Sequence, residues 1–168
     1  MTDLKQHIAA VADFPQPGIL FRDIMPLLKA QFEPTIAALD DLLTTAEWAR
    51  IDAIAGIESR GFILGAALAL RRGKGFVPIR KQGKLPPPVS SLDYQLEYGS
   101  ATLEMQPGSG HVLIVDDVIA TGGTMAAAAE LCLRSGFEVD ALIALVDLKL
   151  IPPLHWNGLA LRAALSYD

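Results

Sequence analysis

Short apolar runs alternate along this chain with stretches of helical periodicity, and this alternation is the feature that most limits its possible folds. The apolar runs lie at residues 51–57, 76–79, 112–115 and 139–146, and the helical stretches lie at 61–72 and 124–134. Strands that alternate with helices are typical of an α/β domain with a largely parallel sheet. Because the chain has 168 residues and 51% hydrophobic content, we predict a single domain, residues 1–168, with an open sheet flanked by helices.

Two segments interrupt this pattern, and a third precedes it. Prolines and a glycine punctuate the apolar segment from Phe14 to Pro26, which predicts a structured loop or a small subdomain. The segment from Gln82 to Gln95 contains three consecutive prolines, and a loop this long inside a compact domain is usually functional or disordered. We therefore interpret it as a flexible lid loop. Residues 1–12 have helical spacing of their apolar side chains.

The composition argues against several kinds of partner. Fourteen Lys and Arg stand against 19 Asp and Glu, and the net charge of -5 disfavours a broad electrostatic footprint for nucleic acid. The longest strongly apolar run, Gly61 to Leu70, is too short to span a bilayer, and the single cysteine, Cys132, forms no internal disulfide. We expect a cytoplasmic protein with no nucleic-acid or membrane partner, in which local features hold any anionic ligand.

The strongest functional signal is an apolar strand that ends in Asp116 and Asp117 and leads through a small-residue turn into an alanine-rich helix. The turn, called the cradle below, consists of Ala120, Thr121, Gly122, Gly123 and Thr124. Backbone N–H groups and two hydroxyls at a helix N-terminus can hold a phosphate, and the absence of a Walker lysine favours a monophosphate over ATP. The two carboxylates would repel a bare phosphate, so they suit sugar hydroxyls, bound directly or through Mg²⁺.

This segment resembles the phosphoribosyl pyrophosphate motif of the type I phosphoribosyltransferases. Residues 14–28, 56–66, 78–86 and 96–99 resemble the adenine-specific branch of that family, in matching order. The resemblance implies the type I phosphoribosyltransferase fold with a small N-terminal hood, and a reaction of adenine with phosphoribosyl pyrophosphate that gives AMP and pyrophosphate. It also implies a homodimer, and Mg²⁺ that is bound together with phosphoribosyl pyrophosphate.

The same resemblance assigns the residues around the purine. The hood, Phe14 to Asp23, would cover the base, with the ring of Phe21 stacked on adenine and the backbone of Leu20 reading its edge. Arg22 would bond a ring nitrogen, and Leu148 would lie against the other face of the base. Glu97 matches the acid or base beside the purine.

The pyrophosphate site is predicted after the first apolar run. Glu58, Ser59 and Arg60 form a loop there whose N–H groups and guanidinium suit the leaving group. The resemblance adds a cis peptide bond between Glu58 and Ser59, and contacts from Lys84 and Tyr98 to pyrophosphate. Asp116 and Asp117 would then hold the ribose and favour the cation that develops on it.

Among the departures of the chain from the family pattern, we expect two to lie outside the phosphate site. These are Asp147, where glutamate is usual, and residues 151–154, where a Gly-Arg pair is usual. Three alternatives stay open: an enzyme for a 6-oxopurine, a regulatory module that senses phosphoribosyl pyrophosphate, and a structural α/β protein. The hood sequence disfavours the first, the lack of a basic or helix-turn-helix extension disfavours the second, and several matches in order disfavour the third.

Overall fold

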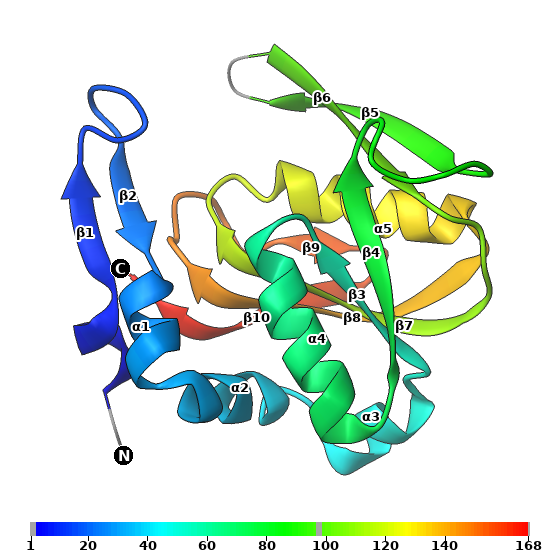
Figure 1. Cartoon of the computed structure of the whole chain (residues 1–168), viewed down its shortest axis with the longest axis horizontal. Coiled ribbons are helices and arrows are strands. Elements are labelled where there is room, and N and C mark those ends of the chain that lie inside the picture. The colour runs from blue at the N-terminus through cyan, green and yellow to red at the C-terminus, as the bar shows by residue number, and fades with distance from the viewer. Residues whose placement is uncertain (1–2, 97–98, 168) are drawn as a thin grey trace.

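The computed structural model describes residues 3–96 and 99–167, and an eight-stranded sheet forms its centre (Figure 1). Five strands run parallel in the order β4-β3-β7-β8-β10, while β5, β6 and β9 pair antiparallel at the two edges. The bounds are β3 Ala53–Ile57, β4 Gly75–Lys81, β5 Ser90–Leu96, β6 Gly99–Met105, β7 Gly110–Ile119, β8 Phe137–Asp147, β9 His155–Trp156 and β10 Leu159–Ser166. The predicted α/β fold with a largely parallel sheet is confirmed.

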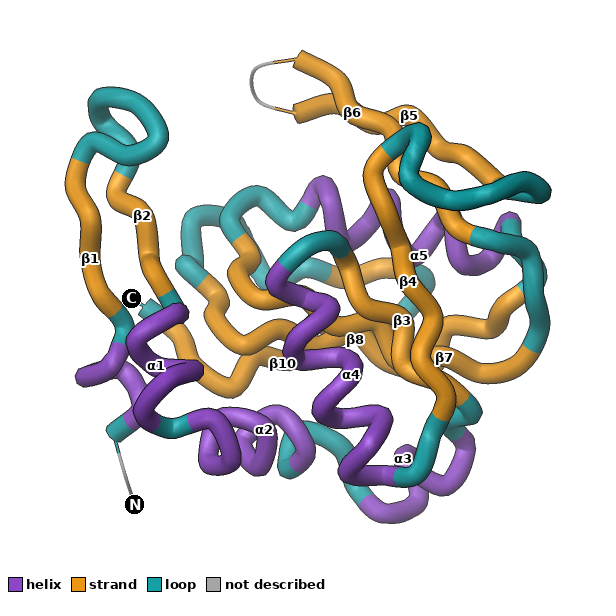
Figure 2. Tube along the Cα trace, in the orientation of Figure 1, coloured by secondary structure: helices purple, strands orange, loops and turns teal. Residues whose placement is uncertain are grey.

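Helices cover both faces of this sheet (Figure 2). They are η1 Leu4–His7, α1 Met25–Ala30, α2 Phe32–Asp40, α3 Thr45–Arg50, α4 Arg60–Arg72 and α5 Gly123–Arg134. Successive strand residues alternate between two apolar clusters. The cluster beneath α2 and α4 takes Ile54, Leu113 and Ile143, and the cluster beneath α5 takes Ala55, Ile114 and Leu142. Both faces of the sheet are therefore buried, which explains why the central strands have continuous apolar sequences.

A separate two-stranded sheet forms the predicted N-terminal subdomain. Strands β1 (Ala9–Ala12) and β2 (Leu20–Asp23) pair antiparallel, and the Asp13 carboxylate accepts the Gly18 N–H at 2.8 Å in the connection between them. The helical spacing expected for residues 1–12 was wrong beyond the short helix η1, because the chain after Ile8 extends to pair with β2.

The prediction that Gln82 to Gln95 is one long loop was also wrong in part. Only residues 82–89 are loop, whereas residues from Ser90 onward form β5 and pair along the whole of β6. The strand has an alternating pattern in Leu92, Tyr94 and Leu96, and the first two of these pack against the α5 cluster. The prolines and polar residues of the segment hid this period-2 signal.

No helix among residues 3–96 and 99–167 has both the length and the apolar character needed to cross a membrane.

Candidate active site

The cradle follows the buried strand β7 and leads into the first turn of α5. Gly122 precedes the helix with φ +78°, a conformation that favours glycine, and Gly123 begins the helix. A small cavity of about 110 Å³ lies here, lined by Asp116, Thr121, Gly122 and Thr124 among others. The first backbone N–H groups of a helix have no partner within it, so this cavity suits one phosphate group.

Asp116 and Asp117 are buried beside the cradle with few compensating partners. The Asp117 N–H donates to Asp116 Oδ1 at 2.8 Å, and Arg60 Nε lies 2.5 Å from Asp117 Oδ2. That oxygen nevertheless accepts no well-aligned hydrogen bond, so the Arg60 contact is one of charge rather than of hydrogen bonding. Burial, and then the charge of Asp117, raise the pKa of Asp116 well above its ordinary value. The pair thus has unmet capacity for a cation or for hydroxyl donors.

The predicted pyrophosphate loop connects β3 to α4, and its Glu58–Ser59 peptide bond is cis, as the resemblance implied. Glu58 accepts hydrogen bonds from the Lys81 N–H at 2.9 Å and from Arg80 Nε at 3.3 Å. Burial alone would raise the pKa of Glu58, but these hydrogen bonds and the charges of Arg80 and Lys84 outweigh it and lower that pKa.

Glycine at position 61 lets this loop approach the carboxylate pair. A Cβ there would lie only 3.0 Å from the Val115 carbonyl oxygen and 3.2 Å from Asp116 Oδ1. The first turn of α4 therefore packs directly on the end of β7, and Arg60 reaches Asp117 from it. The sequence pattern Ser-Arg-Gly is thus explained by packing as well as by chemistry.

A larger cavity of about 490 Å³ joins these parts. The predicted residues that line it are Glu58, Ser59, Arg60, Asp116, Asp117 and Thr124. Sequence reasoning missed Lys81, Tyr94 and Leu96, which also line it, and Thr124 Oγ1 lies 3.4 Å from the Tyr94 hydroxyl. The alternation along β5 was the signal that could have placed Tyr94 and Leu96 on one face.

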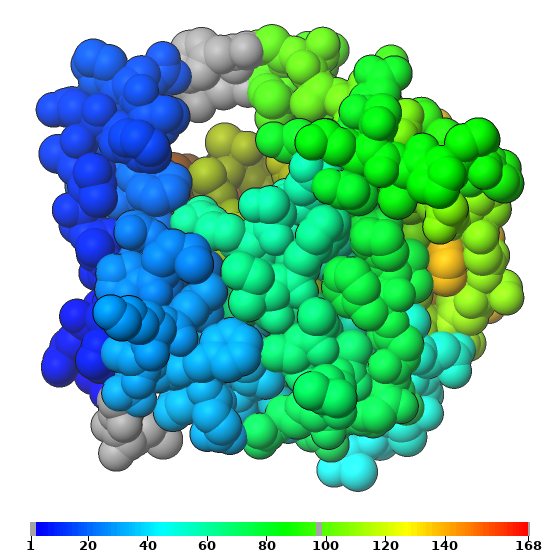
Figure 3. Space-filling view, viewed as in Figure 1, coloured from blue at the N-terminus to red at the C-terminus, as the bar shows by residue number. Residues whose placement is uncertain are grey.

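A third cavity of about 350 Å³ lies beneath the β1–β2 hairpin and is lined by Val11, Phe14, Phe21, Asp23, Met25 and Arg60. The rings of Phe14 and Phe21 meet edge to face at 5.1 Å, and the Arg60 guanidinium lies 5.1 Å from the Phe21 ring. The space-filling view shows the hollow between this hairpin and the β5–β6 hairpin (Figure 3). An aromatic, partly apolar cavity of this kind suits a flat base.

Other predicted residues are not brought into these cavities. On β2, Leu20 is half exposed, and the Arg22 guanidinium lies over the ring of Tyr167, 4.0 Å from its centroid, whereas Phe21 lines the cavity beneath the hairpin. Leu148 packs against the α2–α4 cluster, and its N–H donates to the Ile119 carbonyl at 3.0 Å. Their roles toward a base stay predictions.

The predicted residues of the lid region lie in three different situations. Lys84 is exposed on the loop 82–89, and the lysine that lines the central cavity is Lys81 instead. Glu97 and Tyr98 lie outside the described residues.

The expectation that residues 151–154 lie away from the phosphate site was wrong. A Cβ placed on Gly122 would meet Ile151 Cδ1 and Leu154 Cδ1, each at 3.3 Å, so these apolar side chains pack behind the cradle. Asp147, the other departure, ends β8, where its carboxylate accepts the Lys149 N–H at 2.9 Å. The cradle is therefore supported by a segment that differs from the family pattern.

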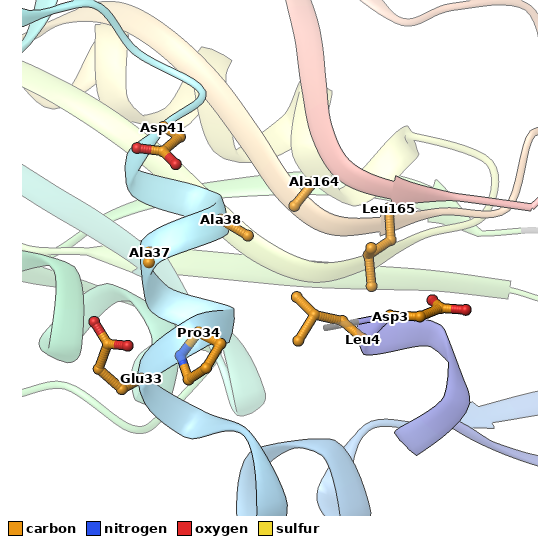
Figure 4. A pocket seen from close by; sticks show the side chains of 9 residues that line it. All are labelled: Asp3, Leu4, Glu33, Pro34, Ala37, Ala38, Asp41, Ala164 and Leu165. Atoms are coloured by element: carbon orange, nitrogen blue, oxygen red, sulfur yellow. The ribbon is translucent and has the colours of Figure 1, made fainter. Parts of the chain in front are cut away.

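A further cavity, of about 620 Å³, lies between η1, α2 and β10 (Figure 4). Its floor is apolar, with Leu4, Ala37, Ala38 and Leu165, and its described charged residues are Asp3, Glu33 and Asp41. A wall of carboxylates repels phosphate, so size alone does not identify the reactive site.

Comparison with known proteins agrees with this geometry. The phosphoribosyl transferase domain family matches residues 36–150, and the chain therefore belongs to the phosphoribosyltransferases. It is 51% identical to the adenine phosphoribosyltransferase of Hydrogenovibrio crunogenus over 98% of this chain and 96% of that protein. The corresponding enzyme of Bdellovibrio bacteriovorus is 48% identical, over 98% of this chain and 99% of that one. Within the class, the chain belongs to the adenine phosphoribosyltransferases.

Solved structures lead to the same result. The adenine phosphoribosyltransferase of Rhodothermus marinus has a TM-score of 0.84 and 44% identity, covering 98% of this chain and 96% of that chain. The enzyme of Saccharomyces cerevisiae has a TM-score of 0.86 and 38% identity, covering 97% of both chains. That structure is a complex with adenine and with D-2,5-dideoxy-2,5-imino-altritol 1,6-bisphosphate.

Proposed function

We propose that this protein transfers the 5-phosphoribosyl group from phosphoribosyl pyrophosphate to adenine in purine salvage, giving AMP and pyrophosphate. The observation that carries the proposal is that three cavities share their walls. Asp116 and Thr124 line both the small cradle cavity and the central one, and Arg60 lines both the central cavity and the one beneath the hairpin. A phosphate, a sugar with its leaving group, and a base can therefore bind side by side. The adenine and bisphosphate in the yeast relative support the same assignment.

In this proposal the residues act mainly by binding and by electrostatics. The cradle holds the 5′-phosphate, Asp116 and Asp117 accept hydrogen bonds from the ribose hydroxyls, and Phe21 stacks on adenine. Ser59, Arg60 and Lys81 stabilise pyrophosphate as its bond to C1 breaks, and a ring nitrogen of adenine forms the new bond to C1. The purine proton passes to a base, for which Glu97 is the candidate.

Mg²⁺ is proposed as the cofactor, and the acidic pair fits it. Asp117 Oδ2 is buried without a hydrogen bond, and a cation beside the pair would offset the burial and the mutual repulsion that raise the pKa of Asp116. In the described part of the chain no group of three or more His, Cys, Asp or Glu could hold a metal ion, so most oxygen ligands would have to come from phosphoribosyl pyrophosphate. The ion would neutralise charge on the leaving group.

We also propose a homodimer in the cytoplasm. Ile63, Ala66 and Leu70 follow one exposed side of α4, with Leu70 86% exposed and Phe76 37% exposed nearby. A second copy that covers this apolar stripe would remove it from water. Leu70→Asp should give a monomer in sedimentation, whereas Leu133→Asp, on the exposed side of α5, should leave the dimer intact. A monomeric unsubstituted protein would refute the proposal.

The lone cysteine, Cys132, is free and buried, which suits a reducing compartment.

The deciding experiment measures pyrophosphate release from phosphoribosyl pyrophosphate and Mg²⁺ with adenine, hypoxanthine, guanine or xanthine supplied separately. The control is the Asp116→Asn, Asp117→Asn double variant. Release with adenine alone, lost in the control, is the expected result. Release only with an oxopurine would overturn the assignment of the base, and binding without release for any base would favour the regulatory module.

A further inference from the structure

One buried carboxyl group fastens both ends of the loop 82–89, which carries Lys84. Glu104 lies on β6 and is only 6% exposed. Its Oε2 atom accepts the Gly83 N–H at 3.1 Å, and the Ser91 hydroxyl donates to its Oε1 atom at 3.5 Å. Gly83 is the second residue of the loop and Ser91 is the second residue of β5 after it, so a single side chain of the neighbouring strand spans the base of the loop. Neither the resemblance nor the cavity walls point to this residue.

Further contacts hold the same loop without involving Glu104. The Gln82 N–H donates to the Thr102 carbonyl at 3.1 Å, and Gln106 Nε2 donates to the Pro86 carbonyl at 3.3 Å. Arg80 Nη1 donates to the Lys84 carbonyl at 3.4 Å, and Arg80 also bonds Glu58 in the cavity wall. The backbone of Lys84 is therefore fixed between Glu104, through the adjacent Gly83, and a residue that contacts the site.

We propose that Glu104 is a positioning residue, which sets how close the charge of Lys84 lies to Glu58 in the wall of the central cavity and so sets the affinity for phosphoribosyl pyrophosphate. The inference rests on the proposed function. Both Glu104 oxygens are engaged from opposite ends of the loop, so the side chain cannot turn without breaking one of these bonds. Pro86, Pro87 and Pro88 restrict the remaining backbone, and a shift at Gly83 therefore passes to Lys84 instead of being absorbed by the loop.

Kinetics of Glu104→Ala test this role. The KM for phosphoribosyl pyrophosphate should rise about tenfold, the size expected for one lost hydrogen bond to a charged group, while the KM for adenine changes by less than about twofold. Glu104→Gln keeps an acceptor oxygen and should recover most of the affinity. The matched control is Asp93→Ala, which removes the exposed bond that Thr102 Oγ1 donates to Asp93 Oδ1 at 2.6 Å within the same hairpin. Both KM values should stay unchanged in that control.

A double-substitution cycle decides whether Glu104 acts through Lys84. In a Lys84→Ala background, Glu104→Ala should add little to the KM for phosphoribosyl pyrophosphate, because the group it positions is already gone. Full additivity would overturn the proposal. So would a lower melting temperature in Glu104→Ala with an unchanged KM, or equal increases in both KM values, since these describe a structural residue.

Direct binding separates this inference from the proposed function. Titration of the unsubstituted protein and of Glu104→Ala with phosphoribosyl pyrophosphate and Mg²⁺ gives Kd values that need no turnover. If the unsubstituted protein binds phosphoribosyl pyrophosphate but releases no pyrophosphate with adenine, the proposed function fails. The same tenfold difference in Kd would then still support the role of Glu104, and equal Kd values would overturn it.

Discussion

Buried carboxyl groups in two regions of this protein differ in how many hydrogen bonds and charge contacts they have. Asp40 ends α2 and is 5% exposed, and it accepts three hydrogen bonds, from Arg71 Nε at 3.2 Å and from Arg72 Nε and Nη2 at 2.5 and 2.8 Å. Asp116 and Asp117 are 9% and 8% exposed, yet only Asp117 has a charge contact, with Arg60, and the pKa of Asp116 is raised. Similar burial thus produces a satisfied cluster in one region and an unsatisfied pair in the other.

The difference shows which region is built for stability and which for a ligand. A buried carboxylate that lacks partners destabilises the folded state, so it persists where a bound molecule supplies the missing contacts. At the far end of α4, Arg71 also pairs with Glu33 at 2.9 Å and Arg72 stacks near Trp48, so the contacts are complete without a ligand. The comparison can be tested by changing members of each set and measuring both turnover and unfolding.

The largest effect is expected when both unsatisfied carboxylates are removed. Asp116→Asn with Asp117→Asn should lower kcat/KM by roughly a thousandfold, because electrostatic stabilisation of the ribosyl cation and the ribose contacts are lost together. Steady-state pyrophosphate release measures this. A loss of less than about tenfold would mean that the pair is not part of the reacting site.

Removing Asp40 should lower stability and leave turnover almost unchanged. Asp40→Ala leaves Arg71 and Arg72 without their buried acceptor and should lower the free energy of unfolding by about 3 kcal/mol. Urea unfolding measures that loss, and kcat/KM of the folded variant should stay within about twofold of the parent. Substantially impaired turnover with normal stability would reverse the contrast between the two regions.

Much of this organisation was predictable from the sequence, because it depends on local patterns. The continuous apolar runs predicted strands buried on both faces, and the order of acidic residues, cradle and alanine-rich helix predicted a site where the structure has a small cavity. Tyr94 and Leu96 were missed because the three prolines shortly before them predicted a loop for the whole segment. Glu104 and the packing of Ile151 and Leu154 behind Gly122 join positions far apart in sequence, and no local pattern reports such contacts.

A smaller effect is expected when only the raised carboxyl is neutralised. Asp116→Asn should raise the free energy of unfolding near pH 7 by about 1 kcal/mol, although it lowers turnover. Because the folded-state pKa of Asp116 lies above the ordinary value of 3.8, the cost of ionising this group is absent below pH 3.8, grows as the pH rises from 3.8 to the folded-state pKa, and is complete above it. Thermal unfolding should therefore show equal melting temperatures for the two proteins at low pH and a gain for the variant at neutral pH. A variant that is less stable at pH 7 would contradict the view that burial and the charge of Asp117 destabilise the ionised form of Asp116.

The smallest effect concerns a carboxylate of the opposite kind, Glu47 on α3. The pKa of Glu47 is lowered from 4.5 to about 2. The largest cause is its hydrogen bond from Arg162, and the next is its hydrogen bond from the Thr44 N–H. This stabilisation is fully present above pH 4.5 and is lost as the pH falls through about 2, the reverse of the trend at Asp116. Glu47→Gln should cost only about 1 kcal/mol, because Arg162 is partly exposed and solvent screens the pair. The deficit of the variant in urea unfolding should shrink between pH 4.5 and 2, and kcat/KM should not change. If the variant's loss of unfolding free energy stayed constant between pH 4.5 and 2, the charge of Glu47 would not stabilise α3. Asp40 would then be the remaining example of a satisfied carboxylate to compare with Asp116.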